Sequence, residues 1–456
     1  MMLDQLKKIY FLGIGGIGMS ALARFFNKRG IFIYGYDKTE TILTKQLILE
    51  GMQIHYTDDM TLIPTDIDLV VMTPAIPKSM NIYKHFIKLG TPVKKRSQVL
   101  GEITSVVKNI AVAGTHGKTT TSSILAHVLI DSKMPVTAFL GGITKNYNSN
   151  YIDVGNDWMI EEADEYDRSF LQLYPNIAII GSLDADHLDI YGSRENMVES
   201  YVEFASQIQE GGLLLMSDHI QVSDLELFKS KLNPSVQLLT YGFKLGSVSC
   251  VISNNDNGWI NFDYQDDLGN HFKQLKLRMP GNHNIQNATA AIRVAVALGL
   301  KEQQIRTALN SFLGIQRRFE WKFEGQHQVL IDDYAHHPEE LKAAIEGVRS
   351  CYPSRHITGI FQPHLYSRTK DFAQEFAHVL DQLDRIILVE LYPAREEPIE
   401  DISSATIFDK CINPNKFMIQ KINLVVELKK MELDVLITLG AGDLDTLIPD
   451  LIKILK

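Results

Sequence analysis

Cysteine is scarce in this sequence, with only three residues among 456. Cys250, Cys351 and Cys411 lie far apart and are odd in number, so we expect neither a disulfide framework nor a cysteine metal site. The sequence also lacks an apolar run of the roughly 18 residues that a membrane span needs. Its N-terminus has no charged segment followed by a long apolar one. We therefore expect a cytoplasmic protein without a signal peptide or membrane insertion.

An excess of positive charge is also absent. The chain has 45 lysines and arginines against 55 aspartates and glutamates, which gives a formal net charge of −10. This balance argues against a broad nucleic-acid-binding surface, so we expect no nucleic-acid partner, although a small basic pocket for an anion is compatible with it. The 45% of apolar and 22% of charged residues are typical of a globular protein and exclude a disordered or collagen-like chain.

Strand and helix signals alternate along most of the chain, which predicts an α/β protein built from parallel sheets with covering helices. At roughly 150 residues per domain, the length favours about three domains. We place their boundaries at residues 1–107, 108–314 and 315–456. Residues 245–280 differ in character, because Asn254–Gly258 separates two β-rich runs in the manner of a hairpin turn. An antiparallel patch is therefore expected in the central domain.

The strongest motif is Gly114–Thr121, which follows the apolar strand Asn109–Ala113 and precedes a predicted helix. Glycines allow the backbone N–H groups and the helix N-terminus to approach a phosphate chain closely. Lys118 would reach the β- and γ-phosphates, and the Thr119 hydroxyl would bind Mg²⁺. The spacing is shorter than in the general P-loop pattern, because Val112 stands where that pattern has glycine. The alternative is an ordinary helix N-terminus capped by a threonine.

Two acidic motifs directly follow predicted buried strands. Glu161–Asp167 ends one strand, and Asp184–Asp189 with its central His187 follows another. Strand ends of a parallel sheet face the ligand crevice, and Mg²⁺ beside a triphosphate is typically bound by one or two carboxylates. A histidine flanked by aspartates is a further candidate metal ligand. Taken singly, the first motif could be a solvated loop and the histidine could be a hydrogen-bonding loop residue.

The N-terminal Gly13–Gly18 fits the G-x-G-x-x-G pattern after the strand Lys8–Leu12, and Asp37 ends the next predicted strand. This is the dinucleotide fingerprint, in which glycines allow a diphosphate to approach the backbone. The same turn can bind any diphosphate, so the pattern does not by itself indicate NAD. A glycine turn that only packs a helix is the remaining alternative.

Further polar clusters lie toward the C-terminus, and each taken singly is more often structural than functional. They share a position at the ends of predicted parallel strands or at a domain junction, and strand ends converge on one crevice. The clusters are Pro280–Asn287, Arg317–Glu320, Asp332–Pro338 and Phe361–Arg368.

These motifs, in this order and over nearly the whole chain, resemble the Mur ligases, the ATP-dependent amide-forming enzymes of peptidoglycan precursor synthesis. The most specific parts are Gly13–Ser20, the short P-loop Gly114–Thr121, Glu162–Phe170, Asp186–Asp189, Asn282–Asn287 and the two histidine motifs in Asp332–Pro338 and Phe361–Arg368. The resemblance implies a Rossmann-like N-terminal domain that binds the UDP-sugar and a central P-loop ATPase-like domain. It implies a Rossmann-like C-terminal domain that brings the amino acid.

The activity implied by the resemblance is the joining of L-alanine to the lactyl carboxylate of UDP-N-acetylmuramate through an acyl phosphate. ATP and Mg²⁺ would be required, and the enzyme would be a monomer or a homodimer. The alternative within the family is a recycling ligase that attaches a preformed peptide to the same sugar nucleotide; the run Gly13–Ser20 favours the alanine-adding branch. A Rossmann dehydrogenase would leave the P-loop unused, and a P-loop switch or motor would leave the N-terminal glycines unexplained.

The resemblance also implies roles for individual residues. Lys118, Glu162 and His187 would be catalytic, with Thr119 and Glu162 on one Mg²⁺ and His187 on a second. The implied ATP-binding residues are Gly114, Thr115, His116, Gly117, Lys118, Thr119, Thr120, Asn287, Arg318 and Asp333. The implied UDP-sugar-binding residues are Gly13, Gly15, Gly16, Gly18, Asp37 and Thr73. The implied amino-acid-binding residues are Tyr334, His336, His364 and Arg368.

The sequence departs from the family pattern at a few positions. Leu365 stands where the family usually has an arginine after the Phe-Gln-Pro-His motif, so one expected cation for the amino-acid carboxylate is missing. Residues 194–210 contain no lysine, so the carbamylated lysine of several sister ligases is not expected. The base that deprotonates the amine is not identified by the resemblance.

Overall fold

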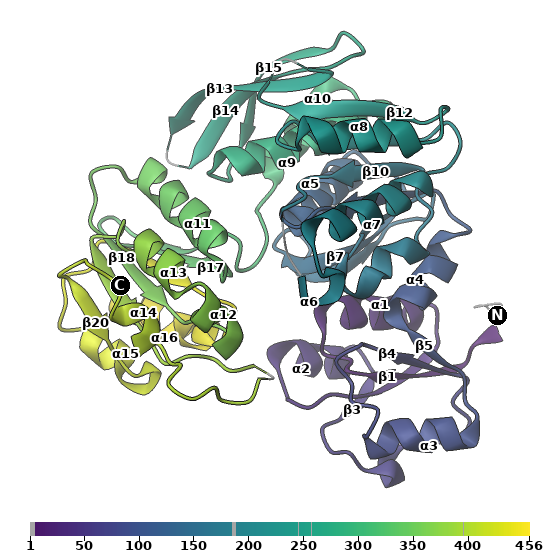
Figure 1. Cartoon of the computed structure of the whole chain (residues 1–456), viewed down its shortest axis with the longest axis horizontal. Helices are drawn as coiled ribbons and strands as arrows, with labels where there is room; N and C mark the ends of the chain where they lie inside the picture. Colours follow the sequence, from purple (N-terminus) through teal and green to yellow (C-terminus); the bar gives the residue numbers. More distant parts are fainter. Residues whose placement is uncertain (1–4, 185–187, 245, 257, 395) are drawn as a thin grey trace. The chain divides into compact units, whose positions relative to one another are not determined.

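The computed structural model describes residues 5–184, 188–244, 246–256, 258–394 and 396–456. Its strands form three separate sheets (Figure 1), and helices connect their parallel strands. This arrangement confirms the predicted three-part α/β fold class, while the domain boundaries after residues 107 and 314 stay a prediction. No helix among the described residues is long and apolar enough to cross a membrane.

By its internal contacts the chain divides into two compact units. The first holds the chain up to Val251 together with Phe262–Leu275 and Gln286–Leu313. The second holds Ile252–Asn261, Lys276–Ile285 and Gly314–Lys456.

The N-terminal sheet has five strands in the order β3-β2-β1-β4-β5, and all neighbouring pairs are parallel. Its central strand β1 is almost wholly buried, as expected for a strand covered on both faces. The strands are β1 (Lys8–Leu12), β2 (Phe32–Tyr36), β3 (Gln53–His55), β4 (Leu69–Met72) and β5 (Val93–Lys95). The helices are α1 (Ile17–Asn27), α2 (Ile42–Leu49), α3 (Asn81–Leu89) and α4 (Arg96–Thr104).

The central sheet has ten strands in the order β15-β14-β13-β12-β11-β10-β6-β9-β7-β8. Strand β6 pairs in parallel with β10 and β9, so the loops that follow these three strands lie at one edge. The strands are β6 (Asn109–Ala113), β7 (Val136–Thr144), β8 (Ser149–Asp153), β9 (Trp158–Glu162), β10 (Ile177–Ile180), β11 (Leu213–Ser217), β12 (Gln237–Gly242), β13 (Val248–Asp256), β14 (Trp259–Gln265) and β15 (His271–Leu277). The helices are α5 (Lys118–Asp131), α6 (Leu188–Tyr191), α7 (Arg194–Ser206), α8 (Val222–Lys231), α9 (Asn282–Ala297) and α10 (Glu302–Ser311), and a 3-10 segment, η3, covers Tyr166–Gln172.

The C-terminal sheet has six strands in the order β16-β17-β21-β18-β19-β20, and only the pair β16–β17 is antiparallel. Its strand residues alternate between two buried clusters, one against each face, which is the period-2 pattern of a sheet covered on both sides. The strands are β16 (Glu320–Glu324), β17 (Val329–Asp333), β18 (Ile357–Phe361), β19 (Arg385–Leu388), β20 (Lys416–Met418) and β21 (Val435–Leu439). The helices are α11 (Pro338–Cys351), α12 (Tyr366–Asp371), α13 (Ala373–Leu380), α14 (Ala405–Phe408), α15 (Lys421–Leu428) and α16 (Ile448–Ile454).

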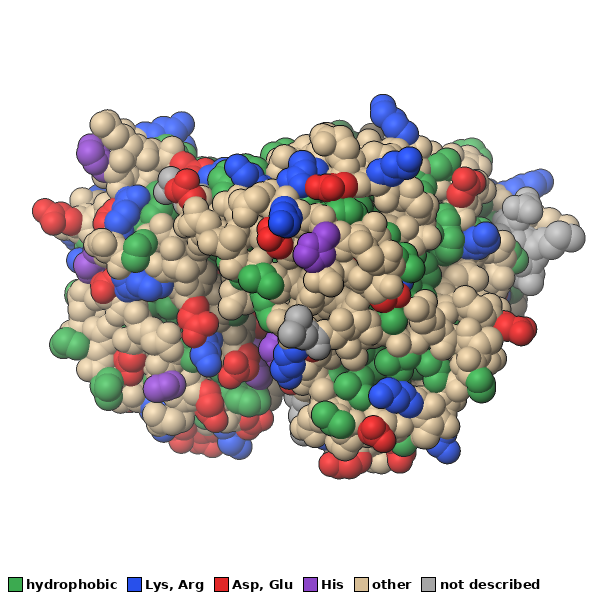
Figure 2. All heavy atoms as spheres, turned by 90° about the horizontal axis from the view of Figure 1, so that it is seen from above, with side chains coloured by type: hydrophobic (Ala, Val, Ile, Leu, Met, Phe, Trp, Pro, Cys, Tyr) green, Lys and Arg blue, Asp and Glu red, His purple; other side chains and the backbone are tan. Residues whose placement is uncertain are grey.

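Acidic and basic side chains are intermixed on the face of the molecule that Figure 2 draws. The net negative charge of the chain is therefore not gathered into a single patch on that face.

Candidate active site

The loop between β6 and α5 carries the P-loop motif, and two of its positions require glycine. Gly114 and Gly117 have φ angles of 128° and 81°, in the region that other residues rarely adopt. A Cβ atom on Gly114 would lie 2.9 Å from the Ser182 backbone nitrogen, and one on Gly117 would lie 2.8 Å from Asn287 Oδ1. The predicted ATP-binding residue Asn287 on α9 therefore packs directly against this loop.

Lys118 begins helix α5, and its ammonium group is held by a buried carboxylate. Lys118 Nζ donates hydrogen bonds to the Gly114 carbonyl at 2.6 Å and to both carboxylate oxygens of Glu165 at 2.8 and 2.7 Å. Burial lowers the pKa of Lys118, but Glu165, Asp164 and Glu162 outweigh it and raise the pKa above its ordinary value. The ammonium is therefore charged at neutral pH. Glu165 belongs to the acidic motif, but no local pattern singled it out as the partner of Lys118.

Glu162, at the end of β9, is brought together with Thr119, the other predicted ligand of the first metal. Its Oε2 accepts a hydrogen bond from Thr119 Oγ1 at 3.0 Å. Its Oε1 accepts hydrogen bonds from Ser122 Oγ at 3.0 Å and from the Gly141 backbone N–H at 2.5 Å. Burial raises the pKa of Glu162, although Gly141 and Lys118 work in the opposite direction. The sequence did not indicate Ser122 or Gly141, because their contacts depend on how helix α5 and strand β7 lie against β9.

The donor set around Glu162 fits Mg²⁺, which prefers oxygen ligands and is usually bound by one or two protein groups together with phosphate oxygens. Thr119 and Glu162 supply one hydroxyl and one carboxylate. Among the described residues, no group of three or more histidines, cysteines and acids could hold a metal ion alone. Nucleotide phosphates would therefore have to complete such a site.

The loop that follows β10 contacts the P-loop through hydroxyl groups. Thr115 Oγ1 lies 2.8 Å from Ser182 Oγ and accepts a hydrogen bond from the Asp184 backbone N–H at 3.2 Å. The His116 backbone N–H donates to Ser182 Oγ at 2.9 Å. Thr120, in the first turn of α5, is buried. The second acidic motif thus begins beside the P-loop, but His187 lies outside the described residues and its metal role stays a prediction.

The glycine turn after β1 is closed by two of the other predicted UDP-sugar residues. The Gly15 backbone N–H donates to Asp37 Oδ2 at 2.7 Å, and a Cβ on Gly15 would lie 2.8 Å from that oxygen. Gly13 has a φ angle of 86°, and a Cβ there would lie 2.7 Å from Thr73 Cγ2. The structure therefore brings Gly13, Gly15, Asp37 and Thr73 together.

Most backbone donors of this turn are already engaged. The N–H groups of Gly13 and Ile14 bond to the Tyr36 carbonyl, and that of Gly16 bonds to the Gly13 carbonyl. Within the described chain, the next N–H groups, those of residues 17–19 at the start of α1, have no acceptor. A helix N-terminus with free N–H groups is suited to an anion. We therefore expect a diphosphate at the first turn of α1 rather than inside the glycine turn.

A basic residue that the sequence did not single out lies beside this helix N-terminus. Arg96 is the first residue of α4, and a Cβ on Gly18 would lie only 3.1 Å from Arg96 Nη1. The Arg96 guanidinium also reaches Asp164 Oδ2 at 3.4 Å, and Lys95 Nζ lies 2.5 Å from Asp167 Oδ2. The start of α4 therefore connects the glycine turn with the acidic motif. Its sequence signal is a run of three basic residues, Lys94–Arg96, at the end of a short strand.

In the C-terminal sheet, Asp333 ends β17 and fastens the chain on either side of it. Its Oδ2 accepts a hydrogen bond from the Phe319 N–H and its Oδ1 one from the Ala335 N–H, both at 2.7 Å. Burial raises the pKa of Asp333 to about 6, although Arg318 opposes the shift. The Arg318 guanidinium lies 5.7 Å from the centre of the Tyr334 ring. The ATP-binding roles of Arg318 and Asp333 stay predictions.

Aromatic and imidazole rings from the ends of β17 and β18 form a continuous group, which contains three of the predicted amino-acid-binding residues. The Tyr334 and His336 rings are 5.3 Å apart, and the His336 and His364 rings are 5.9 Å apart. The His364 ring stacks on Tyr392 at 6.0 Å and 13°. The sequence did not indicate Tyr392, which follows β19.

Arg368, the fourth predicted amino-acid-binding residue, lies on α12 and lowers the pKa of His336 electrostatically. Its guanidinium makes no hydrogen bond or ion pair with any side chain in the described ranges. Leu365 precedes α12 with a φ angle of 71°, which is uncommon for a residue with a Cβ atom. The position where the family usually has arginine therefore holds a strained leucine, and Arg368 follows His364 by four residues.

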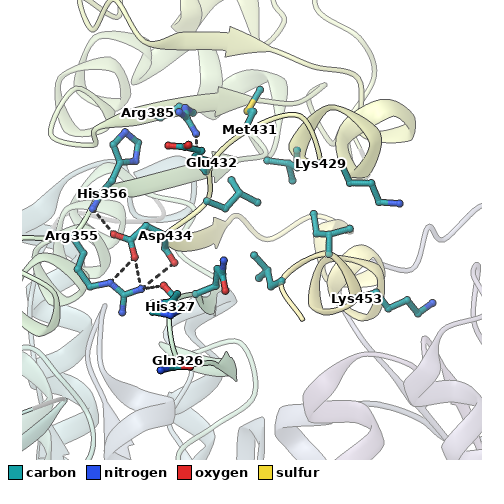
Figure 3. Close-up of a pocket in the computed structure, with 15 residues that line it drawn as sticks. Gln326, His327, Arg355, His356, Arg385, Lys429, Met431, Glu432, Asp434 and Lys453 are labelled. Atoms are coloured by element: carbon teal, nitrogen blue, oxygen red, sulfur yellow. Dashed lines mark hydrogen bonds and ion pairs between the residues drawn. The ribbon is translucent and has the colours of Figure 1, made fainter.

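A cavity of about 1030 Å³ lies at the opposite edge of the same sheet, where β17, β18, β19 and β21 begin (Figure 3). Arg355 at this cavity pairs with Asp434 and donates to the His327 carbonyl. Arg385 donates to the Glu432 carbonyl at 2.9 Å. None of the predicted site residues lines this cavity.

Family models match three consecutive parts of the chain. The model described as "Mur ligase family, catalytic domain" matches residues 8–108, "Mur ligase middle domain" matches 112–295, and "Mur ligase, glutamate ligase domain" matches 317–442.

Curated relatives and solved structures match the chain over nearly its whole length. The UDP-N-acetylmuramate–L-alanine ligases of Flavobacterium psychrophilum and Cytophaga hutchinsonii are 45% and 44% identical, over 99% and 98% of this chain and 99% and 97% of theirs. A UDP-N-acetylmuramate–alanine ligase structure from Thermotoga maritima has a TM-score of 0.83 at 28% identity, covering 98% of each chain. A murein peptide ligase from Psychrobacter arcticus shares the fold, with a TM-score of 0.72 at 21% identity over 98% of each chain. From the P-loop geometry and these matches we conclude that this chain belongs to the Mur ligase family.

Proposed function

We propose that this chain is an ATP-dependent ligase that joins L-alanine to the lactyl carboxylate of UDP-N-acetylmuramate. The observation that carries the proposal is the similarity over the full chain to ligases named for this reaction, at 43–45% identity. The site geometry supports it, because Lys118, Thr119 and Glu162 lie together at the strand ends of the central sheet. The peptide-adding alternative is not favoured, because the curated relatives at 43–45% identity over the full chain are named for the addition of L-alanine.

The first step transfers the γ-phosphoryl group of ATP to an oxygen of the lactyl carboxylate. A bond forms between that oxygen and phosphorus, and the bond from phosphorus to the β-phosphate oxygen breaks, so ADP leaves. Lys118 would hold phosphate oxygens at the N-terminus of α5, and Thr119 and Glu162 would hold Mg²⁺. The chemistry that Mg²⁺ supplies when bound there is neutralisation of charge on the phosphate oxygens.

The second step forms the amide. The L-alanine nitrogen attacks the carbonyl carbon of the acyl phosphate, a tetrahedral intermediate forms, and the carbon–oxygen bond to the phosphoryl group breaks. Phosphorylation turns a poor leaving oxygen into a good one. Arg368 would bind the alanine carboxylate, while Tyr334, His336 and His364 would surround the amino acid. The acyl phosphate reacts with water, so the site must exclude solvent during the reaction.

Phosphate release measured with each combination of sugar nucleotide and amine tests the proposal. We expect rapid release only when ATP, Mg²⁺, UDP-N-acetylmuramate and L-alanine are all present. A preformed peptide in place of L-alanine should give little release. Faster release with the peptide would contradict the proposal and support the recycling ligase instead.

The N-terminal domain should bind a uridine nucleotide and not NAD. The donors that remain at the start of α1 suit a diphosphate, and the relatives that match the full chain are named for a UDP-sugar substrate. Calorimetry with UDP-N-acetylmuramate and separately with NADH checks this. Tight NADH binding without detectable binding of the UDP-sugar would contradict this prediction.

Replacing Gly15 by alanine should weaken UDP-sugar binding, because the added Cβ atom would press on the Asp37 carboxylate.

Replacing Glu162 by glutamine should raise the Mg²⁺ concentration needed for half-maximal activity by more than about tenfold. The substitution keeps the size of the side chain but removes its charge beside Thr119. A Mg²⁺ titration of ATP-dependent phosphate release measures the effect. Glu203→Gln on α7 is a matched control, because Glu203 is exposed. If Glu162→Gln and the control respond to Mg²⁺ alike, the ligand assignment is wrong.

A further inference from the structure

The His336 imidazole is held in one tautomer by its neighbours. Its Nδ1 lies 2.9 Å from the Tyr334 carbonyl oxygen and 3.4 Å from Glu340 Oε2. A carbonyl and a carboxylate oxygen are both acceptors, so the proton of the neutral ring must lie on Nδ1. The lone pair of the neutral ring is therefore on Nε2. The side chain is 22% exposed, so it is not sealed within the core.

Glu340 fixes the position of this ring as well as its tautomer. Glu340 Oε2 accepts hydrogen bonds from the backbone N–H of His336 at 3.1 Å and from that of His337 at 3.3 Å. These bonds fix the backbone of the two residues that directly precede α11. Glu340 is therefore a positioning residue for the His336 ring.

The charges around the ring favour its neutral form. Burial lowers the pKa of His336, Glu340 counteracts this, and Arg368 and Arg318 lower it further, so the net shift is downward. The charged and titratable groups that face the ring are Tyr334, Glu340, His364, Arg318 and Arg368. A neutral ring at physiological pH has an available lone pair and does not repel an ammonium group.

We propose that Nε2 of His336 is the general base that accepts a proton from the amine of L-alanine as it attacks the acyl phosphate. The proposal rests on the proposed function, because it places the amino acid between His336 and Arg368. The ammonium and carboxylate of an α-amino acid are separated by one carbon, so a carboxylate bound by Arg368 brings the amine toward the neighbouring ring.

The proton balance requires one such acceptor. The alanine ammonium loses two protons when it becomes the amide nitrogen, while the carbon–nitrogen bond forms and the carbon–oxygen bond to phosphate breaks. One proton leaves with the released phosphate, which takes the electron pair of the broken bond. The other goes to His336 Nε2, and the imidazolium then returns it to water. The Glu340 carboxylate stabilises the transient positive charge.

His336→Gln provides the test, because glutamine can still donate to the Tyr334 carbonyl but cannot accept the proton at neutral pH. We expect alanine-dependent phosphate release to fall by about 10²–10⁴-fold. Trapping of the acyl phosphate by hydroxylamine should stay close to the unsubstituted enzyme. Hydroxylamine is largely unprotonated at neutral pH, so its attack needs no protein base. His327→Gln, at an exposed position in the same domain, is the matched control.

The pH profile separates a base from a merely structural residue. In the unsubstituted enzyme, kcat/KM for alanine should fall on acidification through a pKa below the ordinary histidine value of about 6.5. This limb should be missing from His336→Gln. Glu340→Gln should move the limb to lower pH, because loss of the carboxylate lowers the pKa of His336 further.

Three results would overturn the proposal. His336→Gln could keep alanine coupling within threefold of the unsubstituted enzyme, or it could lose hydroxylamine trapping together with alanine coupling. The acidic limb could also persist in His336→Gln. Failure of the unsubstituted enzyme to release phosphate on addition of L-alanine is a different result, and it would reject the proposed function itself.

Discussion

Replacing Lys118 by alanine is expected to lower ATP-dependent phosphate release at least about a hundredfold, because positioned charges carry most of the catalysis in phosphoryl transfer. Lys118 starts α5, directly after a left-handed Gly117 that aims the helix N-terminus at the loop. Its ammonium is 2.6 Å from the Gly114 carbonyl and within 2.8 Å of both Glu165 oxygens. No other described lysine begins a helix at this loop, so its charge cannot be replaced locally.

The same substitution should also destabilise the fold, and this effect has to be separated from the loss of catalysis. The Glu165 side chain is only 2% exposed, and it would lose its charged partner. Removing one member of a buried ion pair typically costs about 3–5 kcal/mol. Adding Glu165→Gln to Lys118→Ala should restore much of the melting temperature without restoring activity. Thermal unfolding and phosphate release, measured on both variants, distinguish the two effects.

Two control variants test whether the charge of Lys118 or its position in the P-loop matters. Lys118→Arg keeps the positive charge but changes its shape, so it should fold normally and remain impaired. Lys231→Ala removes an exposed lysine at the end of α8 and should change neither measurement. Near-normal turnover in a folded Lys118→Ala enzyme would contradict the P-loop assignment.

The parts of the candidate site that could be predicted from the sequence are those that form short, continuous sequence motifs. The P-loop was predictable because two glycines and a lysine between a strand and a helix have few other uses. Gly114 and Gly117 both have positive φ angles, as such a loop requires. The contact between Gly15 and Asp37 lies within the reach of the glycine fingerprint, which expects an acid at the end of the second strand. Both features depend on short stretches of chain and their immediate neighbours.

The contacts that sequence reasoning missed depend on segments that meet only in the folded chain. The hydrogen bond from the Gly141 N–H to Glu162 exists because β7 pairs with β9. The residues of β7, Val136–Thr144, do not by themselves indicate that β9 is the neighbouring strand. The antiparallel strand β8 was not predicted either. Arg96 reaches Gly18 because α4 packs near α1, a tertiary approach that hydrophobic periodicity does not encode.

Loss of Arg368 should produce the second large effect, a rise in the KM for L-alanine with little change in the KM for UDP-N-acetylmuramate. Arg368 lies on α12, and its positive charge lowers the pKa of the His336 ring. Leu365, where the family usually has arginine, cannot bind a carboxylate, so we expect Arg368 to supply this charge. A hydrogen bond to a charged group contributes about 1.5–3 kcal/mol, which corresponds to a change in KM of about 10–150-fold.

Initial rates of phosphate release at varied L-alanine and fixed UDP-sugar, and then the reverse, measure the two KM values for Arg368→Ala. Lys370→Ala is the matched control, because Lys370 lies on the same helix but is exposed. Adding Leu365→Arg to Arg368→Ala should recover part of the affinity for alanine, since it places a guanidinium at the start of α12, where Leu365 N–H bonds to the Tyr392 carbonyl beside the ring group. An unaltered alanine KM in Arg368→Ala would reject the amino-acid pocket, and with it the placement of the amine beside His336.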